Sequence, residues 1–182
     1  DAQREAARDA GVELELTPIG KEAFVFIANA GNPLADITLE EIRGVYSGEI
    51  TEWDELGAEG LGEIVPYQRP KGSDSQAALE SLMSGKELMS APAYVSFGDS
   101  DYEAVIEYKN LPNAIGYSYR FYVADLVDSD VKLLAVDGVA PTVENIRTGT
   151  YPYVTRLYAV TRKGEDNPNV AIFLNWVTSD AG

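Results

Sequence analysis

The sequence predicts an α/β fold in which helices pack on a central sheet that is mostly parallel or mixed. Its 182 residues are 45% hydrophobic, which suffices to bury the core of one full domain or of two modest lobes. Residues 23–28, AFVFIA, form a continuous apolar run bounded by polar residues, as in a strand covered on both faces. Along the rest of the chain, strand and helix signals alternate, which is the pattern of α/β layering.

The N-terminal region carries two helix signals. Residues 3–10 are predicted to form an exposed helix that ends at Gly11, because glycine relieves the left-handed backbone at a C-terminal cap. Thr38 and Glu41 have the spacing of a capping box, in which each side chain binds the other residue's backbone N–H. Gly48 can end the helix that follows.

A strand, a turn and a helix are predicted in the next segment. A short helix is expected from Thr51, and residues 63–69 are expected to form a strand. Ser73 and Gln76 have the spacing of a second capping box, which predicts a helix from Ser73 through about Met83. The turn before Ser73 therefore joins a strand end to a helix start.

The C-terminal half continues the alternation. The pair Asp137-Gly138 is a turn signal, and residues 155–161 alternate polar and apolar types as a half-buried strand does. In the last helix Asn167 is the N-cap, Pro168 is the first helical residue, and one face is apolar through Val170, Phe173, Leu174 and Val177. The remaining predicted elements are a helix at residues 99–109, strands at 114–119 and 131–136, and a short helix between Thr142 and Gly149.

Two residue types are absent from the chain, and this narrows its function. Without cysteine there is no disulfide framework and no thiol chemistry, which fits either a reducing compartment or an exported bacterial protein. Without histidine the chain lacks the commonest general base and the commonest transition-metal ligand. Ser-His-Asp catalysis and typical zinc sites are excluded, so we expect a protein that is not an enzyme and holds no cofactor.

Charge and hydropathy narrow the partners. The formal net charge is -16, from 30 acidic and 14 basic residues, and a surface of this sign repels nucleic-acid phosphates and anionic lipids. No apolar run approaches the roughly 20 residues that a membrane helix needs. We therefore expect neither a nucleic-acid partner nor a membrane span. Because the chain starts at Asp1, it is expected to be a piece of a longer protein.

The segment YQRPKGSDSQAALESLM, residues 67–83, has the layout of an anion site. Arg69 ends the predicted strand and Ser73 starts the predicted helix, so the turn should bring the guanidinium close to the unpaired N–H groups of the helix start. A guanidinium can hold two oxygens at once, and the hydroxyls of Ser73 and Ser75 are donors that can rotate toward a ligand. These three residues are the candidate ligands of an oxyanion.

Asp74 stands between the two serines, where a bound anion would have to lie. An aspartate in the first turn of a helix gains about 0.3–1 kcal/mol from the helix dipole, and this one could pair with Arg69 or Lys71. Two like charges about 4 Å apart repel by roughly 4 kcal/mol at an effective dielectric near 20. Asp74 would therefore cost a phosphate site most of its affinity unless its side chain points outward or is protonated.

These residues also have structural interpretations. Capping boxes such as Ser73…Gln76 are more often structural than functional, and an arginine near a strand end more often pairs with a surface carboxylate. Trp53, Tyr46 and Tyr117 are expected to pack in the core rather than to stack on a ligand. Two carboxylate pairs lack the alternating spacing of a calcium loop and are expected to be solvated helix starts: Glu40-Glu41 and Asp99-Asp101.

Several stretches together resemble the extracytoplasmic phosphate-binding proteins that serve ABC transporters. The matching stretches span nearly the whole chain in the family's order: FVFIANAGNPLADITLEEIRGVYSGEITEWDELG, IVPYQRPKGSDSQ, AIGYSYRFYV, VKLLAVDGVAPTVENIRTGTYPYVTRLYAVT and FLNWVTSDAG. The most specific of them are the LEEI…YSGEIT…W run and the Arg-x-x-Gly-Ser-x-Ser loop.

The resemblance implies a two-lobed clamshell of the periplasmic-binding-protein type, in which each lobe is α/β and the ligand lies between the lobes. Residues 20–151 would form the second lobe in full. Residues 1–19 and 152–182 would be parts of the first lobe, and the remaining first-lobe elements and ligand contacts would lie upstream of Asp1.

The resemblance also implies roles for the loop. Arg69, Ser73 and Ser75 match the family's phosphate-contacting arginine, serine and serine-or-threonine positions. Asp74 departs from the family pattern, which usually carries glycine there, and Lys71 departs from it where an acidic residue is common. The positive charge of Lys71 could partly compensate for the negative charge of Asp74.

The first hypothesis is an extracytoplasmic solute-binding protein that captures phosphate or a similar small anion for the permease of an ABC importer. It would work by lobe closure, in the periplasm or on the cell surface, and a lipid anchor on the full-length protein stays open. Two alternatives remain. The chain could be a non-catalytic interaction or scaffold protein that kept the fold and lost phosphate binding, or it could bind another small solute, such as a cationic one that pairs with Asp74.

Overall fold

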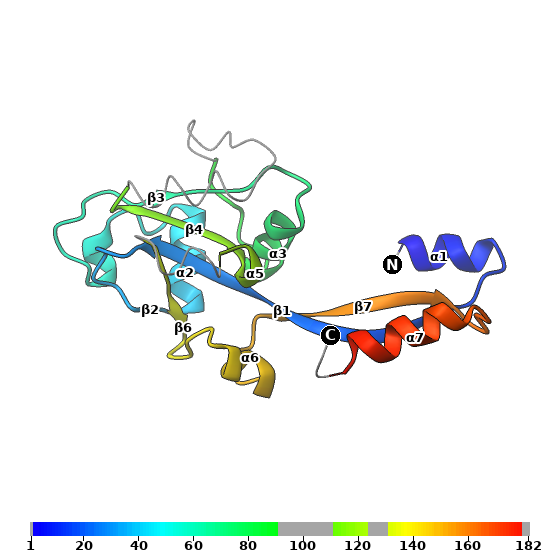
Figure 1. Cartoon of the computed structure of the whole chain (residues 1–182). Helices are drawn as coiled ribbons and strands as arrows, with labels where there is room; N and C mark the ends of the chain where they lie inside the picture. Colours follow the sequence, from blue (N-terminus) through cyan, green and yellow to red (C-terminus); the bar gives the residue numbers. More distant parts are fainter. Residues whose placement is uncertain (1, 91–110, 124–130, 180–182) are drawn as a thin grey trace. The chain divides into compact units, whose positions relative to one another are not determined.

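A computed structural model describes residues 2–90, 111–123 and 131–179 of the chain (Figure 1). By its contacts the chain divides into two compact units, a larger one of residues Ala23–Val154 and a smaller one of residues Asp1–Glu22 and Thr155–Gly182. That these units are the two lobes of a binding fold stays a prediction. The helix predicted at residues 99–109 lies outside the described residues.

The fold is α/β with a mixed sheet, as expected. β1 pairs with β4 and β5 in antiparallel orientation, β3 pairs with β4 in parallel orientation, and β7 also pairs with β1. The central strand β1 is thus antiparallel to β4 and β5, although its apolar run favours a parallel sheet. An apolar run indicates that a strand is covered on both faces, but it does not indicate whether the strand runs parallel or antiparallel to its neighbours. The strands of this sheet are β1 Leu14–Asn29, β3 Val65–Pro66, β4 Ala114–Tyr119, β5 Val131–Leu133 and β7 Val154–Arg162.

A second sheet of two strands pairs β2, Asp36–Ile37, with β6, Ala135–Val136, in parallel orientation. The strand predicted at residues 131–136 is therefore split between two sheets. The predicted turn follows it: Asp137 and Gly138 have φ angles of 51° and 79°, and Val136 and Val139 form an antiparallel bridge across them. Positive φ at both central residues is what asparagine, aspartate and glycine tolerate best in tight turns.

The helix caps predicted at Thr38 and Gly48 are confirmed. Thr38 and Glu41 form both halves of a capping box at the start of α2, and Gly48 ends this helix in the left-handed conformation, with φ 80°. The helix expected from Thr51 is a 3₁₀ helix that starts two residues later. The helices of the larger unit are α2 Leu39–Ser47, η1 Trp53–Leu56, α3 Asp74–Leu82, α5 Arg120–Val123 and α6 Val143–Thr148, the last capped by Thr142.

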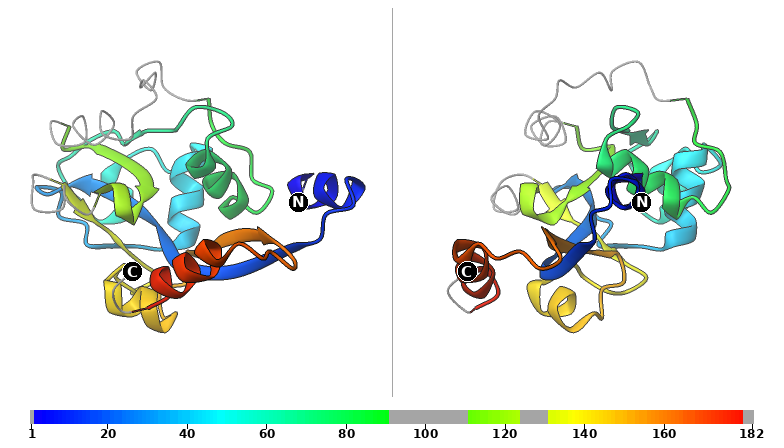
Figure 2. Two further views of the ribbon diagram at one scale, coloured as in Figure 1. Left: turned by 45° about the vertical axis from the view of Figure 1, so that its right-hand side comes forward. Right: turned by 90° about the vertical axis from the view of Figure 1, so that its right-hand side faces the viewer.

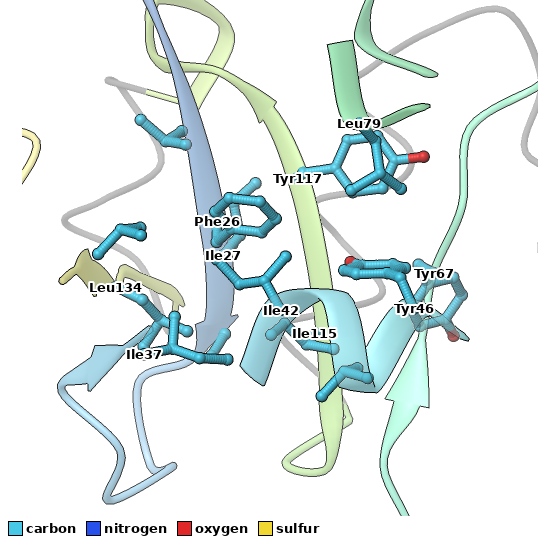
Figure 3. Packing of buried hydrophobic residues seen from close by; sticks show 14 of the residues in the cluster. Phe26, Ile27, Ile37, Ile42, Tyr46, Tyr67, Leu79, Ile115, Tyr117 and Leu134 are labelled. Atoms are coloured by element: carbon cyan, nitrogen blue, oxygen red, sulfur yellow. The ribbon is translucent and has the colours of Figure 1, made fainter. Parts of the chain in front are cut away.

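The described hydrophobic core lies in the larger unit. Trp53 and Tyr46 have no exposed surface and Tyr117 is 1% exposed, so the three aromatic residues are core residues, as predicted. Helices α2 and α3 lie side by side (Figure 2), and the Nε of Arg43 donates to the carbonyl oxygen of Leu82 between them. In Figure 3 the ring of Tyr117 extends from β4 toward α3, in the same cluster as side chains from β1 and α2.

The smaller unit contains α1, Ala2–Asp9, and α7, Pro168–Val177, with strand β7 and the first part of β1. Asn167 caps α7 as predicted, since its side chain accepts from the backbone N–H of Asn169. The strand predicted at residues 155–161 is present as β7, but its apolar face is not covered. Large apolar side chains of β7 and of α7 are about half exposed: Leu157 46%, Tyr158 42%, Val160 56%, Ile172 65%, Phe173 55% and Trp176 53%.

None of the helices in the described ranges combines the length and the apolar character needed to cross a membrane.

Candidate anion-binding site

The turn between β3 and α3 is held at both of its ends. On the strand side, the backbone N–H of Tyr67 donates to the carbonyl oxygen of Ile115 at 2.8 Å, which continues the pairing with β4 one residue past Pro66. On the helix side, Ser73 has extended backbone angles and its Oγ accepts from the backbone N–H of Gln76 at 3.2 Å. Ser73 is therefore the N-cap that the sequence predicts, and α3 begins at the next residue.

Only half of the predicted capping box at Ser73 is present. The backbone N–H of Ser73 donates to the carbonyl oxygen of Pro70 at 3.1 Å, so it does not need the side chain of Gln76. The Oε1 of Gln76 instead accepts from the backbone N–H of Arg69 at 3.1 Å. Ser73 therefore caps the helix, whereas the side chain of Gln76 binds the backbone of the turn at Arg69.

Tyr117 is the second side chain that contacts the backbone of Arg69. Its hydroxyl accepts from the Arg69 N–H at 2.9 Å and donates to the Oε1 of Gln76. Burial raises the pKa of the Tyr117 phenol, so the hydroxyl keeps its proton and remains a donor. The strand β4 thus reaches across to the start of α3 through one buried hydroxyl.

The four predicted site residues lie within this turn and the first turn of α3. Arg69 and Ser73 are partly buried and Ser75 is buried, with 7% of its surface exposed, whereas Asp74 is exposed. In the part of the chain that the structure describes, no salt bridge joins Asp74 to Arg69 or to Lys71. The ion pair that would neutralise the Asp74 carboxylate within this turn is therefore not formed.

The first turn of α3 offers hydrogen-bond donors. Among the described residues, the backbone N–H groups of Asp74 and Ser75 donate to no other group, as expected for the first residues of a helix. The helix dipole gives these groups partial positive charge, and the hydroxyl of the N-cap Ser73 and that of Ser75 belong to the same helix start. Such a set of donors suits an oxyanion. Within the described ranges no group of His, Cys, Asp and Glu residues could hold a metal ion.

Sequence reasoning missed two residues of this site. Tyr117 was predicted only as a core aromatic, and Gln76 only as half of a capping box. Their shared contact with Arg69 depends on the register that sets β3 parallel to β4, with Val65 opposite Ala114 and Pro66 opposite Ile115. No local pattern announces that register, although the alternation along β4 does place Tyr117 on the same face as Ile115.

Comparison with known proteins gives the family. The family model described as PBP superfamily domain matches residues 1–181. The chain belongs to the PBP superfamily. It is 31% identical over 174 residues to the phosphate-binding protein PstS of Bacillus subtilis (strain 168), covering 93% of this chain and 55% of that protein. It is 24% identical over 171 residues to the phosphate-binding protein PstS of Borreliella burgdorferi, covering 91% of this chain and 61% of that protein.

Solved structures of the PBP superfamily have the same fold. A putative phosphate ABC transporter substrate-binding protein from Clostridium perfringens, with bound phosphate, superposes with a TM-score of 0.75 at 28% identity, covering 97% of this chain and 70% of that one. An ABC-type phosphate transport receptor from Vibrio cholerae gives a TM-score of 0.71 at 21% identity, covering 92% and 68%. The resemblance to phosphate-binding proteins of ABC transporters is confirmed, and the chain spans 55% to 61% of the length of the two PstS relatives.

Proposed function

We propose that this chain is part of an extracytoplasmic receptor that captures phosphate for an ABC importer. One observation supports the proposal above the others: in a member of the PBP superfamily, the partly buried Arg69 lies in the turn that leads into α3, whose first residues carry free hydrogen-bond donors. Relatives and structural neighbours that are named for phosphate binding point to the same ligand class. The receptor would bind and release phosphate without a reaction.

Each proposed ligand residue has a separate task. The guanidinium of Arg69 supplies the full positive charge and a planar fork that can hold two phosphate oxygens. The backbone N–H groups of Asp74 and Ser75 supply donors that the helix dipole polarises. The hydroxyls of Ser73 and Ser75 can each donate or accept, so they can adapt to a phosphate that carries one proton or two. Together these groups select a tetrahedral oxyanion by charge and by donor number.

Asp74 sets the limit on affinity. Its backbone N–H is kept, but its carboxylate adds a negative charge to the first turn of the helix, next to the proposed ligand. At 4 Å and an effective dielectric near 20, the repulsion between this carboxylate and the anion would be roughly 4 kcal/mol. Because the side chain is exposed, water screens part of this repulsion. We therefore expect Asp74 to weaken phosphate binding rather than to abolish it.

A second candidate function rests on the same residue. A protein that had kept the fold and lost the ligand would tolerate a carboxylate at the anion site, and the net charge of -16 fits a role in interaction with a cationic partner. Under this alternative, removal of the Asp74 charge would leave phosphate binding absent. The same variant therefore separates the two functions.

The partner and the location follow from the proposal. A receptor of this kind would deliver phosphate to the permease of its transporter, and it would work outside the cytoplasmic membrane, as the family resemblance implies. Additional ligand contacts would come from parts of the family fold that this chain does not span. Losing three charge-assisted hydrogen bonds at about 1.5–3 kcal/mol each costs about three to six decades of affinity, so the 182-residue chain alone is expected to bind phosphate weakly.

Titration calorimetry tests the proposed function with three proteins: the 182-residue chain, a form extended to the length of the PstS relatives, and the extended form with Asp74→Gly. We expect weak binding by the first, tighter binding by the second and the tightest by the third, because glycine removes the local charge and leaves room for the anion. Tight binding by the 182-residue chain would contradict the argument that contacts are missing. No phosphate binding by either extended form would favour the alternative function.

A further inference from the structure

The backbone N–H of Arg69 is held by two buried side chains that come from different elements. It donates to the Tyr117 hydroxyl of β4 at 2.9 Å and to the Oε1 of Gln76 in α3 at 3.1 Å. Tyr117 is 1% exposed and Gln76 is 5% exposed. Each of these acceptors loses its hydration when it is buried, so burial without a hydrogen-bond donor would cost free energy. The Arg69 N–H supplies a donor to both of them.

Both acceptors are themselves fixed. The ring of Tyr117 packs against Phe24, at 5.4 Å between ring centroids, and against Tyr46, at 5.5 Å, and this packing restricts the position of its hydroxyl. The amide of Gln76 cannot be turned over, because its oxygen must accept from both the Arg69 N–H and the Tyr117 hydroxyl while its Nε2 donates to Glu80 at 3.3 Å. Neither side chain can follow Arg69 if the turn moves.

Within the turn itself, one further backbone hydrogen bond is described, from the N–H of Ser73 to the carbonyl oxygen of Pro70 at 3.1 Å. Pro70 restricts Arg69 to extended backbone angles but cannot donate a hydrogen bond, and Gly72 adopts φ 92°, which only glycine reaches freely. Lys71 and Gly72 are exposed. Tyr117 and Gln76 therefore hold the backbone position from which the Arg69 side chain leaves.

We propose that Tyr117 and Gln76 are positioning residues for anion binding, which fix the backbone of Arg69 so that its guanidinium is aimed at the first turn of α3. The inference rests on the proposed function and adds to it a pair of residues that never touches the ligand. Preorganisation of this kind spares the site the cost of ordering the arginine when the anion arrives.

The test compares two tyrosines. Tyr117→Phe removes the hydroxyl and keeps the packed ring, and Tyr151→Phe is the matched control, because Tyr151 is also 1% exposed in the larger unit and donates to the carbonyl oxygen of Phe24 at 2.9 Å. Phosphate is titrated into the 182-residue protein and followed by the amide resonance of Ser75. Loss of one such hydrogen bond predicts binding that is about threefold to tenfold weaker for Tyr117→Phe and unchanged for Tyr151→Phe.

A double-mutant cycle distinguishes positioning from general damage to the fold. In an Arg69→Ala background the Tyr117→Phe substitution should change phosphate binding no further, and exchange of the Arg69 amide hydrogen should speed up in Tyr117→Phe alone. Gln76→Met, which removes the other acceptor, should reproduce both effects if Tyr117→Phe folds poorly. Two results would overturn the inference and leave the proposed function intact. One is an equal loss of phosphate affinity in Tyr117→Phe and Tyr151→Phe, and the other is a loss from Tyr117→Phe in the Arg69→Ala background as large as in the unsubstituted protein. No phosphate binding by the unsubstituted protein, either as the 182-residue chain or in the extended form, would overturn the proposed function together with the inference.

Discussion

The two units of this chain bury their apolar residues in opposite ways. All buried hydrophobic residues of the described core fall within residues 23–154, whereas the large apolar side chains of β7 and α7 in the smaller unit are about half exposed. Strand β1 passes through both environments: its residues 23–29 are all buried, while residues 14–22 are exposed or partly exposed. Backbone pairing therefore makes a strand in both units, but only one unit supplies the layers that cover it.

The candidate site lies in the larger unit, which has a buried hydrophobic core of its own. Arg69, the residues of α3 and Tyr117 all belong to the larger unit, where aromatic packing and buried hydrogen bonds fix the turn. The smaller unit has amphipathic elements without a core of its own among the described residues. Exposed apolar faces of this kind commonly mark contact surfaces, and the stretch that this chain matches is 55% to 61% of the length of the PstS relatives.

A pair of phenylalanine substitutions, one in each unit, should show the largest difference in stability between the two units. Phe26→Ala empties a site with no exposed surface and should destabilise the larger unit by about 3–5 kcal/mol. Phe173→Ala changes a side chain that is 55% exposed and should cost less than about 0.5 kcal/mol. Urea unfolding followed by the fluorescence of Trp53, in a Trp176→Phe background, measures the effect of each variant on the larger unit. Similar losses in the two variants would contradict the comparison.

Helix caps give a smaller contrast. Thr38→Ala removes a capping box from α2 and should lower the unfolding free energy of the larger unit by about 1 kcal/mol. Asn167→Ala removes the cap of α7 in the smaller unit, so the unfolding midpoint reported by Trp53 should hardly move. An Asn167→Ala effect on that midpoint as large as the Thr38→Ala effect would show that the two units unfold as one.

The smallest expected effect concerns exposed ion pairs. Lys86 bridges Glu40 and Glu49 at 2.9 Å in the larger unit, and Lys163 pairs with Glu13 at 2.7 Å in the smaller one. Hydrogen bonds to the two glutamates raise the pKa of Lys86, and those from Lys86 and Arg43 lower the pKa of Glu40. The Lys86 contribution to stability is present below pH 10.5 and is lost as the pH rises through its raised pKa. The Glu40 contribution is present above pH 4.5 and is lost as the pH falls through its lowered pKa.

Thermal melts across this pH range check the ion pairs. Lys86→Met should flatten the profile slightly at both ends, and high salt should reproduce part of that change. Lys163→Met is the control in the smaller unit and should leave the melting of the larger unit unchanged at every pH. A Lys86→Met profile that overlays the unsubstituted one would mean that the bridge contributes nothing in solution.

Local signals explain what could be predicted from the sequence. The caps at Thr38 and Asn167, the turn at Asp137-Gly138 and the start of α3 after Ser73 each depend on residues within one turn of the position concerned. The same holds for the proposed ligands, since Arg69 and Ser73 are close in sequence. Their chemistry is visible before any fold is known.

What could not be predicted depends on contacts between distant segments. The antiparallel pairing of β1 with β4 and β5 joins residues far apart in the chain, and alternation within a strand carries no information on direction. The Gln76 side chain does not complete the capping box, because its Oε1 accepts from the Arg69 N–H of the preceding turn and from the Tyr117 hydroxyl of β4. The exposure of β7 could not be predicted either, because an apolar pattern shows which face a strand would bury and not whether a layer is there to cover it.

A phosphate titration followed by amide chemical shifts tests the central claim most directly, namely that the start of α3 in the larger unit binds an oxyanion. With ionic strength held constant by chloride, the account predicts the largest saturable shifts at the amides of Asp74 and Ser75, and their loss in Arg69→Ala. The start of α7, capped by Asn167 in the smaller unit, provides the internal comparison and should not respond. Saturable shifts confined to α7, or no shift at Asp74 and Ser75 in either the 182-residue or the extended protein, would contradict the account.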